Sequence, residues 1–378
     1  MKKYAKKIKC KNIFFCAPLP PPITGQSLAC ELLISSLLRI SNVQIINLSK
    51  DGFRQGISSV ARVRQIINIF MTLKSKLKSS YFDIFYFTIS ESIAGNFKDL
   101  VIYAICWRRL DRMVIHLHGG AGMRVIMSNK HPLLRAVNSF FLKRFGAVIV
   151  LGDRLKSIYE GVVLPSNLHA VPNFAKDEFF VLPDDIVEKF ASVEPLRLLF
   201  LSNLLPGKGH VELLAALSKL APEMCRRLSV DFAGGFESPE DERRFREQAQ
   251  AVKHMQINVH GIVHGEHKRD LLRNAHLFCL PTYYPYEGQP ISILEAYASG
   301  CAVMTTDHSG IFDTFTPGVN GIEVKPRSPD SIAQAIEHAL AHTYDLCGYA
   351  KHNLQQAQQK YRTSMHVEAL EKIIFSVA

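Results

Sequence analysis

Short apolar runs alternate with longer stretches of helical periodicity along almost the whole chain. Buried strands are predicted at residues 12–17, 43–48, 84–88, 113–120, 147–151, 196–201, 228–233, 257–261, 277–280 and 302–305. Helices are predicted at residues 26–38, 60–78, 100–107, 211–220, 267–275, 290–298, 332–341 and 367–375. Strands that alternate with helices in this way indicate an α/β fold built on doubly wound parallel sheets.

The chain is long enough for two such domains. Its 378 residues exceed the size at which a single hydrophobic core normally stops growing. We expect an N-terminal domain at residues 1–180, a second domain at 190–355, and a C-terminal helix at 356–378 that packs back on the first domain. Residues 175–195 are acidic, punctuated by proline and weakly periodic, so we interpret them as an interdomain linker.

Positive charge is concentrated in the first half. Residues 1–189 carry 27 Lys and Arg against 13 Asp and Glu, whereas the remainder carries 18 against 21. A half with this excess would attract a polyanion or an anionic membrane surface. The basic amphipathic pattern at 60–78 suits either a membrane surface or a core-packed helix with a solvated charged face. No apolar run is long enough to span a bilayer or to form a cleavable signal.

The eight cysteines indicate a reducing compartment. They form no Cys-x-x-Cys pair, and several stand in apolar runs that read as strands. We therefore interpret them as small, reduced core residues of a cytoplasmic protein, not as metal ligands or disulfides.

The strongest candidate chemistry lies around Pro290, which fits the first turn of a helix. The backbone N–H groups of Gly288 and Gln289 would point outward at the N-terminus of that helix, which suits a phosphate. Glu287 on the loop and Glu295 within the helix are better suited to accept hydrogen bonds from the hydroxyls of a sugar or ribose. A capped core helix with two solvated glutamates would show the same pattern.

Two further loops with glycine follow strands of the second half. Lys208 stands between Gly207 and Gly209. Because glycine has no side chain, the backbone and the lysine ammonium can approach a diphosphate closely. Gly234 follows another strand, and the carboxyl ends of parallel strands meet at one edge of a sheet. Together with Glu287 these loops suit a nucleotide sugar. No Asp-x-Asp motif occurs, so we expect Lys208 and the helix, and not a metal ion, to neutralise the leaving group.

In the first half, candidate ligand-binding residues follow two predicted strands. His118 and Gly119 end one of them, where an imidazole beside glycine suits close approach by a ligand. Metal binding by His116 and His118 is disfavoured, because no carboxylate or Cys cluster accompanies them. Gly25 and Gln26 lie in the first strand-to-helix turn, which lacks G-x-G-x-x-G and could equally be a plain turn.

Taken together, these motifs resemble the retaining GT-B glycosyltransferases of family 4. Glu287 and Glu295 match the family's E-x7-E signature, and Pro206-Gly207-Lys208-Gly209 matches its diphosphate-lysine loop. Residues 260–263 and 275–282 match its base-contacting segment and the strand before the signature, and His118-Gly119 matches the histidine of its first domain. The resemblance covers the whole chain, with the stronger motifs in the second half.

This resemblance implies two Rossmann-like domains facing a central cleft. It also implies transfer of a hexose-type sugar, with retained configuration, from a nucleotide-diphosphate donor, UDP being preferred to GDP. The implied catalytic residues are His118 near the reacting sugar, Glu287 on that sugar and Lys208 on the diphosphate. The other implied donor contacts are Asn203, Gly207, Gly234, Val263, Gly288, Gln289, Pro290, Ile291 and, at the ribose, Glu295. The implied acceptor contacts are Gly25, Gln26 and Gly119.

Two positions depart from the family pattern. Asn203 stands where the family often has an arginine, so that charge is supplied elsewhere or the donor's phosphates are held more weakly. Residues 22–25 replace the family's open glycine turn, which bears on the acceptor contacts near Gln26.

We expect the acceptor to be a glycan or a polyprenyl-diphosphate-linked saccharide in the synthesis of a bacterial surface polysaccharide. The protein would be cytoplasmic and bound peripherally to the anionic inner face of the plasma membrane, without a metal or other cofactor. The alternatives are a GT-B epimerase or phosphorylase, an inactive scaffold of the same fold, and a nucleic-acid-binding protein. The chain lacks a recognised nucleic-acid-binding motif, and intact Glu287, Glu295 and Lys208 argue against an inactive scaffold.

Overall fold

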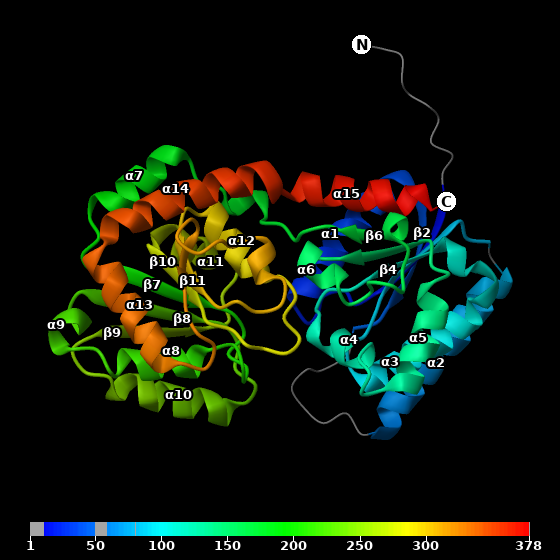
Figure 1. Cartoon of the computed structure of the whole chain (residues 1–378), viewed down its shortest axis with the longest axis horizontal. Helices are drawn as coiled ribbons and strands as arrows, with labels where there is room; N and C mark the ends of the chain where they lie inside the picture. Colours follow the sequence, from blue (N-terminus) through cyan, green and yellow to red (C-terminus); the bar gives the residue numbers. More distant parts are fainter. Residues whose placement is uncertain (1–10, 50–58, 80, 378) are drawn as a thin grey trace, which may run out of the picture. The chain divides into compact units, whose positions relative to one another are not determined.

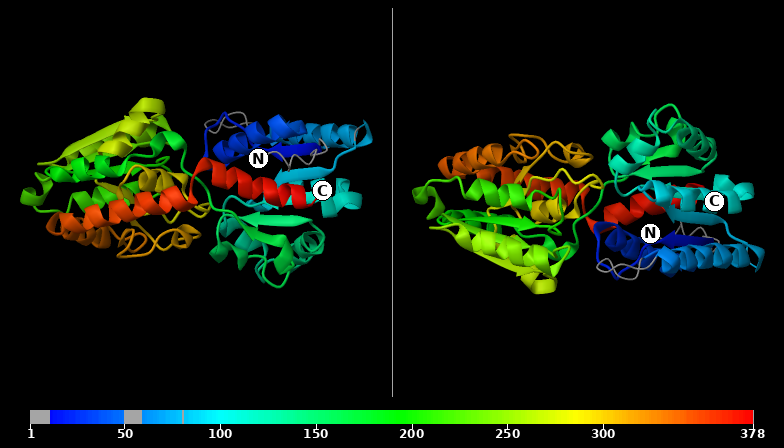
Figure 2. Two further views of the ribbon diagram at one scale, coloured as in Figure 1. Left: turned by 90° about the horizontal axis from the view of Figure 1, so that it is seen from above. Right: turned by 90° about the horizontal axis from the view of Figure 1, so that it is seen from below.

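The computed structural model describes residues 11–49, 59–79 and 81–377, which form two compact units. The first unit covers the chain up to Pro172 and again from His366, and the second covers Asn173–Met365. Each unit is built around its own six-stranded parallel sheet, with helices on both faces (Figures 1 and 2). The expected α/β architecture is confirmed.

The sheet of the first unit is buried on both faces. Its strands are β1 (Asn12–Ala17), β2 (Asn42–Asn47), β3 (Ile84–Thr88), β4 (Met113–His116), β5 (Ala147–Val150) and β6 (Leu168–Ala170), in the order β2-β1-β3-β4-β5-β6. Along β1, Phe14 and Cys16 enter one core cluster and Ile13 and Phe15 the other. Burial on both faces explains why these strands are continuous apolar runs and not alternating ones.

Different helices cover the two faces of this sheet. The core that contains Phe14 takes side chains from α2 (Ser59–Ser79), α3 (Ile93–Ile105), α4 (Ala121–Ile126), α5 (Pro132–Leu142) and α6 (Asp153–Lys156). The core that contains Phe15 takes side chains from α1 (Gly25–Ile40) and from α15 (Thr363–Ser376), through Leu370 and Ile374. The end of the chain therefore completes the first unit (Figure 1).

The sheet of the second unit has the strand order β12-β11-β10-β7-β8-β9. Its strands are β7 (Leu196–Leu201), β8 (Leu228–Ala233), β9 (Gln256–Gly261), β10 (Leu277–Leu280), β11 (Ala302–Thr305) and β12 (Gly321–Glu323). Its helices are α7 (Pro183–Ala191), α8 (His210–Leu217), α9 (Pro222–Cys225), α10 (Pro239–Ala251), α11 (Gly265–Asn274), α12 (Ile291–Ala298), α13 (Pro329–Ala341) and α14 (Thr343–Lys360). β7, β10 and β11 are neighbours, so the loops that follow them meet at one edge of the sheet.

Interpretation of residues 175–195 as a linker is wrong. The segment belongs to the second unit and contains a 3₁₀ turn (Asp177–Phe179) and α7. Ile186 of α7 is fully buried, and the ammonium of Lys189 donates to the carbonyls of Ala275, Ser299 and Gly300 at 3.1, 2.7 and 2.8 Å. Lys189 thus satisfies carbonyls that α11 and α12 leave unpaired at their C-terminal ends. The acidic, proline-containing sequence therefore forms a packed helix and not a linker.

Other sequence expectations differ in detail. β4 ends at His116, so His118 lies beyond the strand and not within it. The expected terminal helix at 356–378 is instead the end of α14 and, after a break at Tyr361, the separate helix α15. Across the described ranges, no helix has both the length and the apolar content required to cross a membrane.

Candidate functional site

The loop between β7 and α8 is shaped by two glycines in the left-handed region. Gly207 has a φ of 92° and Gly209 a φ of 88°, which other residues rarely adopt. A Cβ atom at Gly209 would lie 2.4 Å from the carbonyl oxygen of Pro281, so only glycine allows this approach. The N–H of Tyr283 donates to the Gly207 carbonyl at 2.7 Å. These contacts fix the loop that carries Lys208 against the segment that follows β10.

Lys208 and Glu287 form a covered ion pair. The Lys208 Nζ atom lies 2.6 Å from Glu287 Oε2, and their side chains are only 13% and 10% exposed. The Thr282 hydroxyl lies 3.2 Å from the same carboxylate oxygen, and the lysine ammonium stands 4.6 Å from the centre of the Tyr284 ring. Sequence reasoning placed Lys208 and Glu287 at one edge of the sheet, and the structure brings them into direct contact.

The loop after Glu287 has its peptide groups held in place. The Glu287 carbonyl accepts a hydrogen bond from the Ser309 hydroxyl at 2.6 Å, and the Gly288 carbonyl accepts one from the Gly310 N–H at 3.0 Å. The carbonyl and N–H of a trans peptide group point in opposite directions. Holding these two carbonyls therefore fixes the directions of the Gly288 and Gln289 N–H groups.

The helix after this loop begins one residue later than expected. Pro290 has a φ of −63° and an extended ψ of 120°, and it precedes the first helical residue, Ile291. The ring of Pro290 still sets the entry into α12, and its missing N–H is still not needed there. Ile291 is buried, so its side chain contributes to packing, and only its backbone can serve a ligand at the helix N-terminus.

Glu295 is buried inside the unit and not solvated. It is 2% exposed, and Lys268 Nζ lies 2.7 Å from both of its carboxylate oxygens. Burial raises the pKa of Glu295, and the charge of Lys268 opposes that rise. Sequence reasoning missed Lys268, because nothing in the pattern of α11 separates it from the other charged residues of that helix.

The remaining predicted donor residues follow β7, β8 and β9 of the same sheet. Asn203 follows β7 and is exposed, and Val263 follows β9 and is buried. Gly234 follows β8, with a φ of 148° and its N–H donating to the Gly261 carbonyl at 2.7 Å. A Cβ atom there would lie 1.8 Å from the Ser202 carbonyl oxygen, so Gly234 has a structural requirement independent of any ligand.

In the first unit, His118 lies within a cluster of imidazoles. Its ring centre is 3.9 Å from that of His116, whose Nδ1 lies 2.6 Å from the Tyr86 hydroxyl. Burial, and then the nearby His366, lower the pKa of His118 to about 3. His118 is therefore a neutral imidazole at physiological pH, able to form hydrogen bonds but not to supply a positive charge.

Gly119 lies against a carboxylate that sequence reasoning missed. A Cβ atom at Gly119 would lie 1.5 Å from Glu91 Oε1, and the Gly122 N–H donates to Glu91 Oε2 at 3.2 Å. Glu91 follows β3, the strand beside β4, so the signal available in the sequence was its place after a strand. The carboxylate lies at the start of α4, where negative charge is favourable.

The turn between β1 and α1 forms the N-terminal cap of α1. Thr24 accepts a hydrogen bond from the Ser27 N–H at 3.1 Å, and Ser27 Oγ accepts one from the Thr24 N–H at 2.8 Å. Gly25 is the exposed first residue of α1, and Gln26 is half-buried. The departure from an open glycine turn is thus a reciprocal capping box.

We found no cluster of three or more His, Cys, Asp or Glu side chains suited to a metal ion in the parts of the chain that the structure describes. The histidines around His118 come from β4, the loop that follows it, and α15, with no carboxylate among them that completes a metal site.

Comparison with known proteins places this site in a family. Residues 184–360, nearly the whole second unit, match the family described as glycosyl transferases group 1. Lys208, Glu287 and Glu295 all lie within this glycosyl transferases group 1 region.

Two curated relatives match parts of the chain. An uncharacterized glycosyltransferase of Methanocaldococcus jannaschii is 28% identical over 144 residues, which are 38% of this chain and 35% of the relative. An N,N'-diacetylbacillosaminyl-diphospho-undecaprenol alpha-1,3-N-acetylgalactosaminyltransferase of Campylobacter jejuni is 31% identical over 90 residues, or 24% of this chain and 23% of the relative. The matches thus span about a third and a quarter of these relatives.

Solved structures match nearly the whole chain. The HepE protein of Anabaena, in complex with UDP and glucose, has a TM-score of 0.69 at 16% identity and covers 97% of this chain and 100% of its own. The sucrose-phosphate synthase of Thermosynechococcus elongatus has a TM-score of 0.73 at 14% identity, with the same coverage. WaaG, a glycosyltransferase involved in lipopolysaccharide biosynthesis, has a TM-score of 0.69 at 14% identity, over 96% and 99%. The fold is GT-B, with two Rossmann-like units.

Proposed function

We propose that this protein is a retaining glycosyltransferase that moves a hexose-type sugar from a nucleotide-diphosphate sugar to a glycan or lipid-linked saccharide. The observation that carries the proposal is the Lys208–Glu287 pair beside the fixed N–H groups of Gly288 and Gln289. A cation and oriented N–H groups suit a diphosphate, and a carboxylate suits sugar hydroxyls. The family of residues 184–360 supports it.

The two members of this ion pair would contact different parts of the donor. Lys208 and the N–H groups of the 288–289 loop bind the diphosphate and stabilise its charge as it leaves, so no metal or cofactor is required. Glu287 orients the transferred sugar. Glu295 accepts hydrogen bonds from the ribose, and the charge of Lys268 opposes the rise in its pKa that burial causes. UDP is the proposed nucleotide, supported by the UDP complex of the Anabaena protein.

His118, Gly25, Gln26 and Gly119 are the proposed acceptor-side residues. Since His118 is neutral, it would position the reacting sugar by hydrogen bonding, and the leaving phosphate would take the proton of the acceptor hydroxyl. A lipid-linked saccharide acceptor is supported by the name of the Campylobacter relative, which specifies a diphospho-undecaprenol-linked sugar. Synthesis of a bacterial surface polysaccharide is the process that this acceptor suits.

The test is release of nucleotide from UDP-, GDP- and ADP-sugars, with and without a polyprenyl-diphosphate-linked saccharide. We expect UDP release that depends on the acceptor, together with an elongated product in which the anomeric configuration of the donor is retained. Absence of release from every donor would contradict the proposed activity. An inverted product would contradict retention alone.

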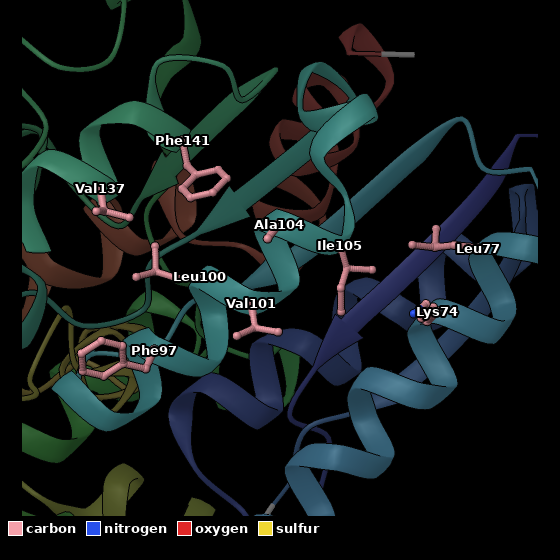
Figure 3. A pocket seen from close by; sticks show the side chains of 9 residues that line it. All are labelled: Lys74, Leu77, Phe97, Leu100, Val101, Ala104, Ile105, Val137 and Phe141. Atoms are coloured by element: carbon pink, nitrogen blue, oxygen red, sulfur yellow. The ribbon is translucent and has the colours of Figure 1, made fainter.

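We also propose that the protein acts at the inner face of the plasma membrane, held there by an apolar groove in the first unit. The groove has a volume of about 770 Å³ and lies between α2, α3 and α5 (Figure 3). Phe97 and Val101 of α3, which line it, are 58% and 41% exposed, and Met71 of α2 is 65% exposed. α2 carries five Lys or Arg residues and no acidic residue, which suits an anionic bilayer.

Vesicle binding tests this surface. We expect sedimentation with vesicles that contain phosphatidylglycerol, weakened by salt, and little binding to vesicles of phosphatidylcholine alone. Lys74→Gln should weaken the binding about fivefold, and Phe97→Ser with Val101→Ser should weaken it further. The matched controls are Lys351→Gln, and Val211→Ser with Tyr344→Ser, which change exposed residues of the second unit. Equal binding to both kinds of vesicle would contradict the proposal.

A further inference from the structure

Three exposed aromatic side chains gather at the edge of the first unit's sheet where its strands begin. Tyr81 comes shortly before β3, Trp107 comes before β4, and Phe140 lies near the end of α5, which leads into β5. These three strands are neighbours in the sheet and run parallel, so they begin at the same edge. The three side chains are 53%, 48% and 44% exposed, so each presents much of its ring to solvent.

Arginine side chains lie over all three rings. The guanidinium carbon of Arg109 is 4.6 Å from the centre of the Tyr81 ring. That of Arg144 is 3.9 Å from the centre of the Phe140 ring and 5.7 Å from that of Trp107. The rings of Trp107 and Phe140 are themselves stacked, with centres 5.4 Å apart. We call these five residues the edge cluster, in which apolar rings and positive charges are presented together.

The chain around the edge cluster is strongly basic. Residues 101–150 contain eight Lys or Arg residues and a single acidic residue, Asp111. Arg108 and Lys143, which are next to members of the cluster in the sequence, are exposed. A local excess of this size favours an anionic partner. The apolar stem of an arginine can lie along an apolar surface while its guanidinium group reaches a phosphate.

The edge cluster is continuous with the apolar groove between α2, α3 and α5. Phe141 lines that groove (Figure 3), and its ring centre lies 5.4 Å from that of Phe140 and 6.3 Å from that of Trp107. An apolar surface bordered by aromatic rings and arginines matches an anionic bilayer, in which acyl chains are followed by an interface and by charged phosphates. A nucleic acid would engage the rings and the charges, but it has no acyl chain to occupy the groove.

We propose that the edge cluster anchors the protein in the interface of an anionic membrane, with the rings of Trp107 and Phe140 among the lipid headgroups and Arg144 on a lipid phosphate. The inference rests on the membrane location in the proposed function, and not on sugar transfer. His118 and Gly119 follow the carboxyl end of β4, whereas the cluster lies where β4 begins. Anchoring at this edge therefore leaves the proposed acceptor-side residues of β4 outside the surface that the membrane covers.

Trp107 is the only tryptophan of the chain, so tryptophan fluorescence reports on this cluster alone. The experiment titrates the full chain with vesicles of phosphatidylcholine, with and without phosphatidylglycerol. It is repeated with brominated phosphatidylcholine, which quenches a tryptophan that enters the bilayer. We expect the emission of Trp107 to move to shorter wavelength and to be quenched by the brominated lipid, in both cases only when phosphatidylglycerol is present.

Substitutions measured by vesicle sedimentation separate the two parts of the cluster. Phe140→Ser and Arg144→Gln should each weaken binding to vesicles with phosphatidylglycerol roughly fivefold. The matched controls are Tyr344→Ser and Arg226→Gln, which change exposed residues of the second unit and should leave the binding unchanged. An unchanged melting temperature shows that each variant is folded.

Unquenched emission of Trp107 in vesicle-bound protein would overturn the inference and leave the groove as the membrane contact. Equal losses for Arg144→Gln and Arg226→Gln would overturn the part assigned to Arg144, in favour of net charge. Tighter binding to a single-stranded oligonucleotide than to anionic vesicles would overturn the inference in favour of a nucleic acid. If the wild-type protein binds no anionic vesicle, the membrane location itself fails, and nucleotide release still tests sugar transfer separately.

Discussion

Replacing Glu287 by glutamine is expected to slow sugar transfer roughly 10- to 100-fold while UDP binds at least as tightly as to the wild-type protein. The rate falls because an ionised carboxylate forms stronger hydrogen bonds to sugar hydroxyls than an amide does. UDP binding is preserved because Lys208, which lies 2.6 Å from Glu287, is released to the diphosphate. Initial rates and calorimetric titration measure the two effects separately.

Lys208→Met provides the contrast to Glu287→Gln. It removes the cation from the diphosphate, so UDP affinity and transfer should both fall. Lys219→Met is the matched control, because Lys219 forms an exposed ion pair with Asp330 in the same unit. If Glu287→Gln lost UDP affinity as strongly as Lys208→Met, the carboxylate would be needed to hold the site together, and its assignment to the sugar would be wrong.

Lys268→Met is expected to destabilise the second unit by about 3 kcal/mol above neutral pH, because it leaves a buried carboxylate without its partner. Glu295 is 2% exposed and Lys268 contacts both of its oxygens, so the variant removes both of these contacts from a buried carboxylate. Lys219→Met, which breaks an exposed pair, should change stability by less than about 1 kcal/mol. Denaturant unfolding of both variants measures the difference.

The effect of Lys268→Met should depend on pH in a defined direction. Burial raises the pKa of Glu295, and the variant removes the charge that opposes this rise. Folded Glu295 then holds its proton at pH values where the unfolded chain has lost it. Stability therefore falls as pH rises above the ordinary carboxyl range, and the loss should be smaller near about pH 5 than near about pH 8. A loss independent of pH would show that the lysine contributes packing and not charge.

Much of the fold and part of the candidate site could be predicted from the sequence. Buried parallel strands are continuous apolar runs, so every predicted strand forms, although short β6 and β12 were missed. Gly207 and Gly209 were informative because both have a positive φ, and at Gly209 the carbonyl of Pro281 also leaves no room for a side chain. Since the strands before Lys208 and Glu287 are neighbours, their proximity followed from the topology.

The partners of these residues could not be predicted in the same way. Lys268 is an ordinary polar residue in its local sequence, and its role arises from contacts made only in the folded unit. The burial of Glu295 against Lys268 could not be predicted, because a helix pattern does not reveal which neighbour will cover a given face. α7 was interpreted as part of a linker because its acidic, proline-containing sequence gave no sign that Ile186 would be buried or that Lys189 would bind distant carbonyls.

Acceptor-dependent release of UDP from a UDP-hexose, compared between the wild-type protein and Glu287→Gln, tests the central claim most directly. The account predicts rapid release by the wild-type protein only when a polyprenyl-diphosphate-linked saccharide is present, and slow release by a variant that still binds UDP. Equal rates for the two proteins, or no release from any nucleotide sugar, would contradict it.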